Sequence, residues 1–155
     1  MQTQPQPIAH SASAFSAAES IPCQLQQIPA RVVGEVVPLV LPLLEAIVAR
    51  SDGRYSVPGM LEQFARENWQ LWIVWDGSVR AIVATELYFD VSKMKCCTIR
   101  FATGRGAAGW SPLISQIEDW ARDEGCVKID MTARKGWARH LPAYKLSHVF
   151  LEKGL

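Results

Sequence analysis

Apolar positions recur with helical spacing between residues 36 and 50, and this pattern predicts a helix that is most regular after Pro42. The run Ser51-Asp52-Gly53 contains the polar and glycine residues that commonly end a helix. A second, shorter helix is expected after Pro58. The first part of the folded chain is therefore predicted to be helical.

The period then changes from helical spacing to alternation. Residues 69–75 alternate between two faces, as expected of a strand. Asp76-Gly77 is a typical hairpin turn, and residues 79–89 continue the alternation as the return strand. A third β-rich run covers residues 96–102. These three segments predict an antiparallel meander.

The C-terminal part is predicted to begin with a glycine-rich loop, after which helices and strands alternate. The expected elements are the loop 104–110, a helix from Ser111-Pro112 to Gly125, a strand over 127–133, a helix over 135–144 and a final strand over 146–152. Ser111 is suited to cap the first of these helices, with Pro112 at its first position.

Residues 1–31 differ from the rest of the chain. They are rich in Gln, Ser, Ala and Pro, and only Glu19 and Arg31 carry a formal charge. Such a segment buries too little apolar surface to offset the entropy lost on ordering. We therefore expect a low-complexity N-terminal arm over 1–31, which docks on a protein partner, and a single folded domain over 32–155.

Composition narrows the classes of function. The chain has 155 residues, with 16 Lys plus Arg against 15 Asp plus Glu, which does not favour a nucleic-acid partner. The most apolar run, residues 36–48, is interrupted by Pro38, Pro42 and Glu45 and is shorter than the roughly 20 residues of a membrane span. The first 20 residues lack the basic and apolar regions of a secretory signal. We expect neither membrane insertion nor secretion.

The cysteines and histidines do not show the spacing of a metal site. Cys96 and Cys97 are adjacent, Cys23 and Cys126 are distant in sequence, and the three histidines do not cluster with them. We interpret the cysteines as reduced packing residues and predict no metal.

Three groups of segments are distinctive, namely 57–61 leading to 69–73, then 117–122 with Gly125-Cys126, and finally 134–139 continuing through Leu141-Pro142. Together they resemble small GNAT-like proteins of tailed phages and prophages, where GNAT denotes the Gcn5-related N-acetyltransferases. Over residues 33–155 this resemblance implies an α+β, GNAT-like acyltransferase fold, with a mostly antiparallel central sheet and helices on both faces.

The resemblance also implies acetyl-CoA as cofactor. In that family, amides of the loop and of the following helix hold the pyrophosphate, because free N–H groups attract an anion. The implied cofactor-binding residues are Phe101, Ala102, Arg105, Gly106, Ala107, Ala108, Gly109 and Trp110. The implied catalytic residues are Glu86 as general base and Tyr144 as general acid.

Two functions follow as hypotheses. Ala108 and Trp110 occupy the last two small-residue positions of the family's loop, counted from Arg105, and Pro112 removes one amide. The first hypothesis is therefore a phage or prophage protein with a degenerate acetyl-CoA loop, acting as a virion-associated or assembly component. It would bind other particle proteins through residues 1–31, in the host cytoplasm or in the phage particle. The alternative is an active acetyl-CoA-dependent N-acetyltransferase acting on a protein or a small amine.

A dinucleotide-binding fold is a further alternative. Gly104-x-Gly106-x-x-Gly109 matches the glycine fingerprint of that fold, and Asp130 follows at a suitable distance. Such a fold requires a parallel sheet built from several βα units.

Overall fold

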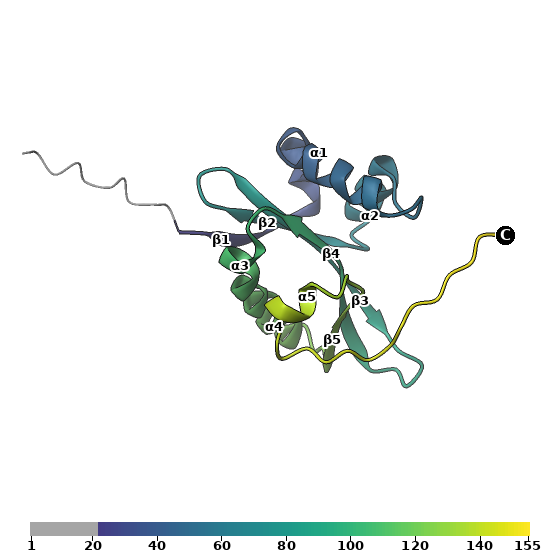
Figure 1. Ribbon diagram of the computed structural model, residues 1–155. Helices are drawn as coiled ribbons and strands as arrows, with labels where there is room; N and C mark the ends of the chain where they lie inside the picture. Colours follow the sequence, from purple (N-terminus) through teal and green to yellow (C-terminus); the bar gives the residue numbers. More distant parts are fainter. Residues whose placement is uncertain (1–21) are drawn as a thin grey trace, which may run out of the picture.

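The computed structural model describes residues 22–155, which form one five-stranded sheet flanked by helices (Figure 1). The strands are β1 (Gln24–Ile28), β2 (Gln70–Trp75), β3 (Val79–Phe89), β4 (Lys95–Gly104) and β5 (Lys128–Met131). Their spatial order is the same as their order in the chain. Each strand is antiparallel to its neighbour except β5, which is parallel to β4.

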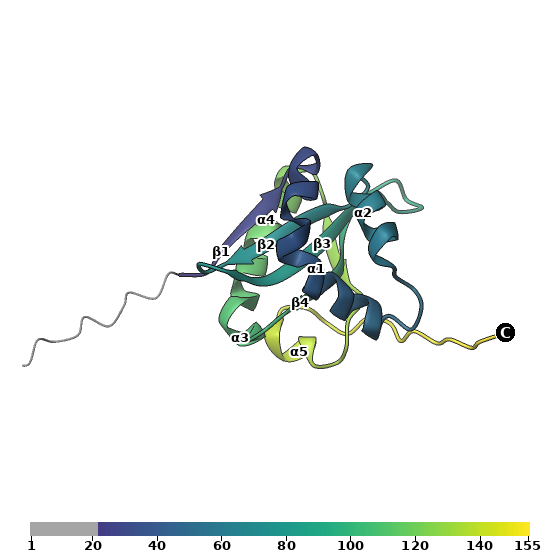
Figure 2. The same ribbon diagram turned by 90° about the horizontal axis from the view of Figure 1, so that it is seen from above.

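Helices cover both faces of the sheet, as the two views show (Figures 1 and 2). One face carries α1 (Val33–Arg50) and α2 (Val57–Ala65), preceded by the 3-10 turn Ala30–Val32. The other face carries α3 (Ala107–Trp110), α4 (Ile114–Asp123) and α5 (Trp137–His140), with the 3-10 turn Ser111–Leu113 between α3 and α4. The α+β architecture predicted from the sequence is therefore confirmed.

Helix α1 continues through two prolines. Pro38 and Pro42 are four residues apart and both are exposed, so the carbonyl groups that lose their helical partners face solvent. On the opposite side, Val40 and Leu44 are fully buried against the sheet. The helical stretch Ala30–Arg50 is long and apolar enough to cross a membrane by length and composition, and in this fold it supplies the core of one face.

The core on the α1 and α2 side is largely aromatic. Trp69 has edge-on contacts with the rings of Tyr55, Phe64 and Phe101, at centroid distances of 5.9 to 6.3 Å. Tyr55 and Phe101 are also edge-on to each other. Helix α2 is positioned there by its N-cap, since the hydroxyl of Ser56 accepts a hydrogen bond from the amide of Gly59 at 3.1 Å.

The core on the α4 side contains a buried hydrogen-bond chain. Trp72 packs edge-on against Trp120 at 5.1 Å and donates its indole N–H to the hydroxyl of Thr85 at 2.9 Å. Thr85 in turn donates to the side-chain oxygen of Gln70 at 2.9 Å. The chain satisfies two polar groups that burial would otherwise leave unpaired.

Several sequence predictions require correction. Residues 24–28 lie within the predicted arm but form the edge strand β1, so the folded domain begins before residue 32; residues 1–21 lie outside the described part of the chain. The helix predicted over 135–144 is limited to α5, and the strand predicted over 146–152 is wrong, because these residues adopt neither helix nor strand. Antiparallel pairing of β1 to β4 also excludes the dinucleotide-binding fold.

Candidate active site

A wedge between β4 and β5 is the first feature of the candidate site. The two strands pair only from Cys96–Lys128 to Ile99–Met131. Beyond this seam β4 continues to Gly104, while the chain after Met131 turns away towards α5 (Figure 1). No described strand pairs with the outer edge of residues 100–104, so their backbone N–H and C=O groups are available to a ligand.

The loop that follows β4 is fixed where it leaves the strand. A Cβ on Gly104 would lie 2.3 Å from the Cβ of Ala81 and 2.5 Å from the carbonyl oxygen of Arg80, so only glycine allows β4 to remain this close to β3. The amide of Arg105 donates to the same carbonyl at 3.2 Å. Gly106 then adopts a left-handed conformation with φ of 65° and begins α3.

Free backbone donors gather at this turn. The amides of Gly106, Ala107 and Ala108 precede the first helical hydrogen bond, in which Gly109 donates to Gly106 at 2.9 Å. Ala108 and Gly109 are exposed, as is the side chain of Arg105, which forms no ion pair with any residue in 22–155. A loop with these groups can bind a phosphate-type anion.

The indole of Trp110 lies inside the core. Its exposed fraction is 1 %, and it packs edge-on against Trp137 of α5 with ring centroids 5.5 Å apart. Its N–H donates to the carbonyl oxygen of Arg105 at 3.2 Å. Trp110 was predicted to bind the cofactor. Its backbone lies at the loop, but its side chain is buried and cannot contact a ligand there. Phe101 is likewise buried, among Tyr55 and Trp69.

The contact between α3 and α5 brings a second basic segment near the loop (Figures 1 and 2). Arg134, Lys135 and Arg139 lie just before or within α5, and all three are exposed. None of them forms an ion pair within residues 22–155. Together with Arg105 they give four exposed cations without an acidic partner, an arrangement that favours an anionic ligand.

A β-bulge shapes the middle of β4. Ala84 pairs with Phe101 and Thr85 pairs with Ile99, which leaves Arg100 as the extra residue. The guanidinium of Arg100 lies over the ring of Trp69, 4.9 Å from its centroid, and its Nη1 is 3.3 Å from Oε2 of Glu86. The Nε atom of Arg100 is buried without an acceptor. An unpaired buried donor beside an open strand edge marks a place where a ligand oxygen can bind.

Polar side chains share one face of the sheet beside this bulge. Glu86, Thr98 and Asp130 occupy one rung across β3, β4 and β5. Tyr88 reaches across β4 and donates its hydroxyl to Oδ2 of Asp130 at 2.5 Å. This hydrogen bond, together with desolvation, raises the pKa of Tyr88 above its usual range. Tyr88 therefore stays protonated at neutral pH and acts as a hydrogen-bond donor.

The two predicted catalytic residues lie on opposite faces of the sheet. Glu86 is on the α1 and α2 side, next to Arg100 and Trp69. Tyr144 packs in the core on the α4 side and donates its hydroxyl to Oε2 of Glu118 at 2.8 Å. Burial, followed by this hydrogen bond, raises the pKa of Tyr144 above its usual range. The structure does not bring the two side chains together.

The described cysteines are all free, and none has the environment of a nucleophile. Cys96 and Cys97 are buried, and burial raises the pKa of the Cys97 thiol to about 12. Desolvation also raises the pKa of Cys126. The Cys97 and Cys126 thiols are therefore poor nucleophiles near neutral pH, as expected of packing residues. Within residues 22–155 no group of His, Cys, Asp or Glu side chains is arranged to hold a metal ion.

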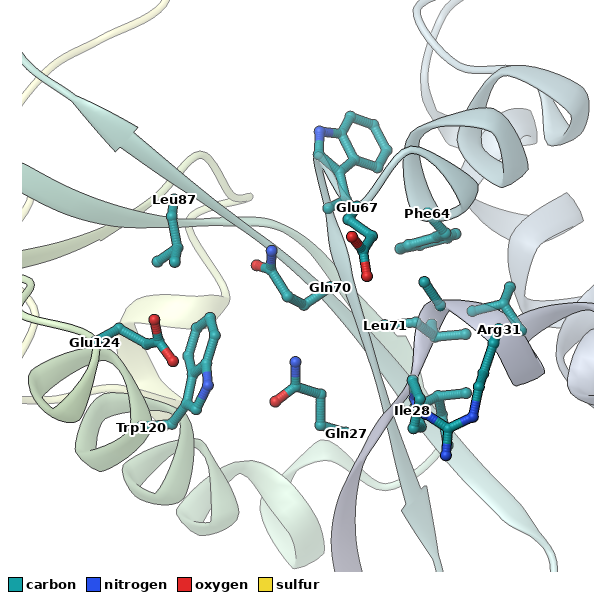
Figure 3. A pocket seen from close by; sticks show the side chains of 14 residues that line it. Gln27, Ile28, Arg31, Phe64, Glu67, Gln70, Leu71, Leu87, Trp120 and Glu124 are labelled. Carbon is teal, nitrogen blue, oxygen red and sulfur yellow. The ribbon is translucent and has the colours of Figure 1, made fainter.

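A cavity of about 480 Å³ lies at the other end of the strands, where β1 ends and β2 begins (Figure 3). Gln27, Gln70 and Trp120 line one side of it, and Phe64 and Leu71 line the other. None of the site residues predicted from the sequence lines this cavity. Trp69, over which Arg100 lies, also lines the cavity, so the cavity adjoins the polar face around the bulge but not the loop.

Comparison with solved structures identifies the fold. An aminoglycoside acetyltransferase from an uncultured soil metagenomic sample, solved with sisomicin, has a TM-score of 0.63 at 12 % identity and covers 86 % of this chain and 96 % of its own. The ribosomal-protein-alanine N-acetyltransferase of Brucella melitensis has a TM-score of 0.58 at 14 % identity, over 85 % and 99 % of the two chains. An acetyltransferase of Trypanosoma brucei has a TM-score of 0.61 at 13 % identity, over 86 % and 99 %. The chain has the GNAT fold.

At the level of sequence, no protein-family model matches the chain and no curated protein is significantly similar to it. The resemblance described above places acetyl-CoA at Phe101, Ala102 and residues 105–110, which lie along the open edge of β4 and in the loop that follows it. The residues present fit that group, since the loop offers free amides and an unpaired arginine, and the open edge of β4 offers unpaired backbone groups.

Sequence reasoning missed Tyr88, Arg100 and Asp130. Alternation along residues 79–89 places Tyr88 on the same face as Glu86, so this residue could have been found. The role of Arg100 could not have been found from the sequence, because the position of a bulge depends on the register between two strands. Asp130 was assigned only to the dinucleotide alternative.

Proposed function

We propose that this chain is an N-acetyltransferase that uses acetyl-CoA. The observation that carries the proposal is the open edge of β4, which leads directly into a turn with free amides and an exposed arginine. The burial of Trp110 supports it further, because the bulky residue that made the loop look degenerate points inward.

The cofactor side of the proposed site uses the backbone more than side chains. The amides of Gly106, Ala107 and Ala108 would hold the pyrophosphate, with Arg105 supplying a positive charge. Residues 100–104 would bind the extended arm along the unpaired edge. Acetyl-CoA, when bound, supplies the acetyl thioester.

The acceptor side uses the polar face around the bulge. Glu86 is half-buried, and its carboxylate forms an ion pair with Arg100. The guanidinium of Arg100 in turn lies over the ring of Trp69. In the proposed step an amine nitrogen attacks the thioester carbon, and the C–N bond forms while the C–S bond breaks. Glu86 would accept the amine proton, and acetyl-CoA would supply the leaving thiolate, which water can protonate.

Calorimetric titration with CoA and acetyl-CoA tests the cofactor site. We expect saturable binding, weakened about ten-fold or more by Arg105→Ala because a charge-assisted contact to phosphate is lost. Arg66→Ala is the matched control, since Arg66 is an exposed arginine at the C-cap of α2, on the face of the sheet opposite α3. Absence of binding at low salt, or an equal effect of both substitutions, would refute the proposal. Release of free thiol in the presence of an amine panel then tests the transfer step.

The role as a virion-associated or assembly protein stays a prediction. It rests on the sequence resemblance and on the arm, of which residues 1–21 lie outside the described part of the chain. Deletion of all of residues 1–31 would not test this role, because it would also remove β1 from the sheet. Deletion of 1–21 leaves β1 in place, and a loss of incorporation into a particle would then favour this role.

A further inference from the structure

The cavity at the ends of β1 and β2 lies where two helices end (Figure 3). Helix α2 reaches it with Phe64 and with Glu67 just beyond the helix, and α4 reaches it with Trp120 and Glu124. The C-terminal end of a helix carries the negative end of its dipole. The volume of about 480 Å³ is in the range of small-molecule sites. Its position thus favours a positively charged occupant.

The charged groups of the lining do not neutralise one another. Glu67 is exposed, and no ion pair joins it to any residue in 22–155. The carboxylate of Glu124 is 3.7 Å from Lys95, which bonds more closely to the carbonyl oxygen of Glu124, at 2.7 Å. Arg31 is the only cationic residue among the described residues that line the cavity, and it pairs with neither carboxylate. The lining therefore keeps an excess of negative charge.

Glu67 occupies a backbone position that favours glycine. Its φ is 60°, and α2 ends there with the amide of Glu67 bonded to Phe64 at 3.1 Å and the amide of Asn68 bonded to Gln63 at 3.0 Å. Helices that end in this way usually have glycine at the left-handed position, because a side chain is strained there. The chain thus accepts a loss of stability at the one point of α2 where a carboxylate enters the cavity (Figure 3).

Aromatic and amide groups complete the lining. Trp69 and Trp120 supply indole rings, which attract organic cations. The side-chain oxygen of Gln70 is taken by the hydroxyl of Thr85, so the NH2 group of the same amide is left for an occupant (Figure 3). These groups suit an organic ion rather than a bare metal ion, for which no group of side chains in 22–155 is arranged.

We propose that this cavity binds a small organic diamine in its cationic form, with one ammonium group near Glu67 and the other near Glu124. Its hydrocarbon part would contact Trp69 and Trp120. The cavity contains no residue of the loop 104–109 and not Glu86, so this site is independent of the proposed acetyl transfer.

Calorimetric titration of the full chain with 1,6-diaminohexane tests the proposal. 1-Aminohexane and 1,6-hexanediol are the matched probes, with one charge and with none. We expect saturable binding of the diamine, weaker by about ten-fold or more for the monoamine and not measurable for the diol. Binding should weaken as salt is added, because ions screen exposed charges. Equal binding of the diamine and the diol, or no binding of the diamine at low salt, would overturn the proposal.

Substitutions of lining residues locate the bound diamine. Glu67→Gln should weaken binding about ten-fold or more, whereas Arg31→Ala should strengthen it because a repelling charge is removed. Glu45→Gln is the control, since Glu45 is an exposed glutamate of α1 that does not line the cavity. Equal effects of Glu67→Gln and Glu45→Gln would contradict the assignment.

Glu67→Gly separates binding from folding. This variant should bind the diamine as weakly as Glu67→Gln and yet have a higher urea midpoint, because glycine relieves the left-handed strain. A lower midpoint would show that Glu67 serves the fold instead.

Glu86→Gln distinguishes this cavity from the proposed acceptor site. It should leave diamine affinity unchanged, and a loss of affinity would place the diamine beside Glu86 and overturn the proposal. Diamine binding by a chain that does not bind CoA would support this site while refuting the proposed function.

Discussion

Trp110 donates its indole N–H to the carbonyl oxygen of Arg105, five residues earlier, and so closes the turn at the end of β4 from inside the core. The amides of the loop face solvent, while the buried side chain of Trp110 fixes the conformation of the loop. Rigidity of this kind is useful in a binding loop, because less ordering is required when a ligand binds.

Trp110→Phe is expected to weaken this loop. The substitution removes the N–H and part of the ring, so the free energy of unfolding should fall by about 1–2 kcal/mol. CoA affinity should fall as well, because the loop loses its internal support. Urea denaturation and calorimetry measure the two effects. Trp75→Phe, at a 39 % exposed position, is the control and should change neither.

Gly104→Ala should destabilise the protein by roughly 1–3 kcal/mol. The added methyl group would overlap Ala81 and the carbonyl oxygen of Arg80, both in the adjacent strand β3. Gly109 provides a comparison within the same loop, since a Cβ there meets nothing within 4 Å. Equal denaturation midpoints for Gly104→Ala and Gly109→Ala would show that β4 does not approach β3 as closely as described.

Glu86 and Tyr144 should respond differently to substitution. Glu86→Gln is expected to lower the rate of acetyl transfer by about a hundred-fold or more while CoA affinity is kept, because the proton acceptor is lost. Tyr144→Phe should leave the rate nearly unchanged and lower stability by about 1 kcal/mol, because its hydroxyl bonds Glu118 on the other face. A large fall in the rate for Tyr144→Phe would instead support its predicted role as general acid.

The Tyr88–Asp130 hydrogen bond should make stability depend on alkaline pH. The pKa of Tyr88 is raised in the folded state, so above the ordinary tyrosine value of about 10 the unfolded chain releases this proton more readily than the folded chain. The contribution of Tyr88 is thus complete below about pH 10 and declines as pH rises towards its folded-state pKa. Denaturation curves from neutral to alkaline pH should show a shallower decline for Tyr88→Phe than for the natural chain. Parallel declines would contradict the assignment.

The antiparallel meander could be predicted because its information is local. Alternation over residues 69–75 and 79–89, with Asp76-Gly77 between them, specifies a hairpin without reference to the rest of the chain. The glycine-rich loop was predicted for the same reason.

Elements whose stability comes from distant partners could not be predicted. Gln24–Ile28 has the composition of a flexible segment, and only its pairing with Trp75 to Leu71 makes it a strand. Conversely, residues 146–152 are apolar enough for a strand, but no neighbouring edge pairs with them in this chain. For the site, the bulge at Arg100 and the inward direction of Trp110 depend on register and packing that no local pattern contains.

The position of β1 in the sheet also imposes an order of events on the ribosome. β1 precedes α1 and α2 in the chain, yet its partner is β2, so Gln24 meets Trp75 only after both helices have been synthesised. Closing so long a loop is slow compared with forming a helix or a hairpin. The nascent chain therefore carries β1 unpaired at least until β2 has emerged, and this edge of the sheet is completed after both helices.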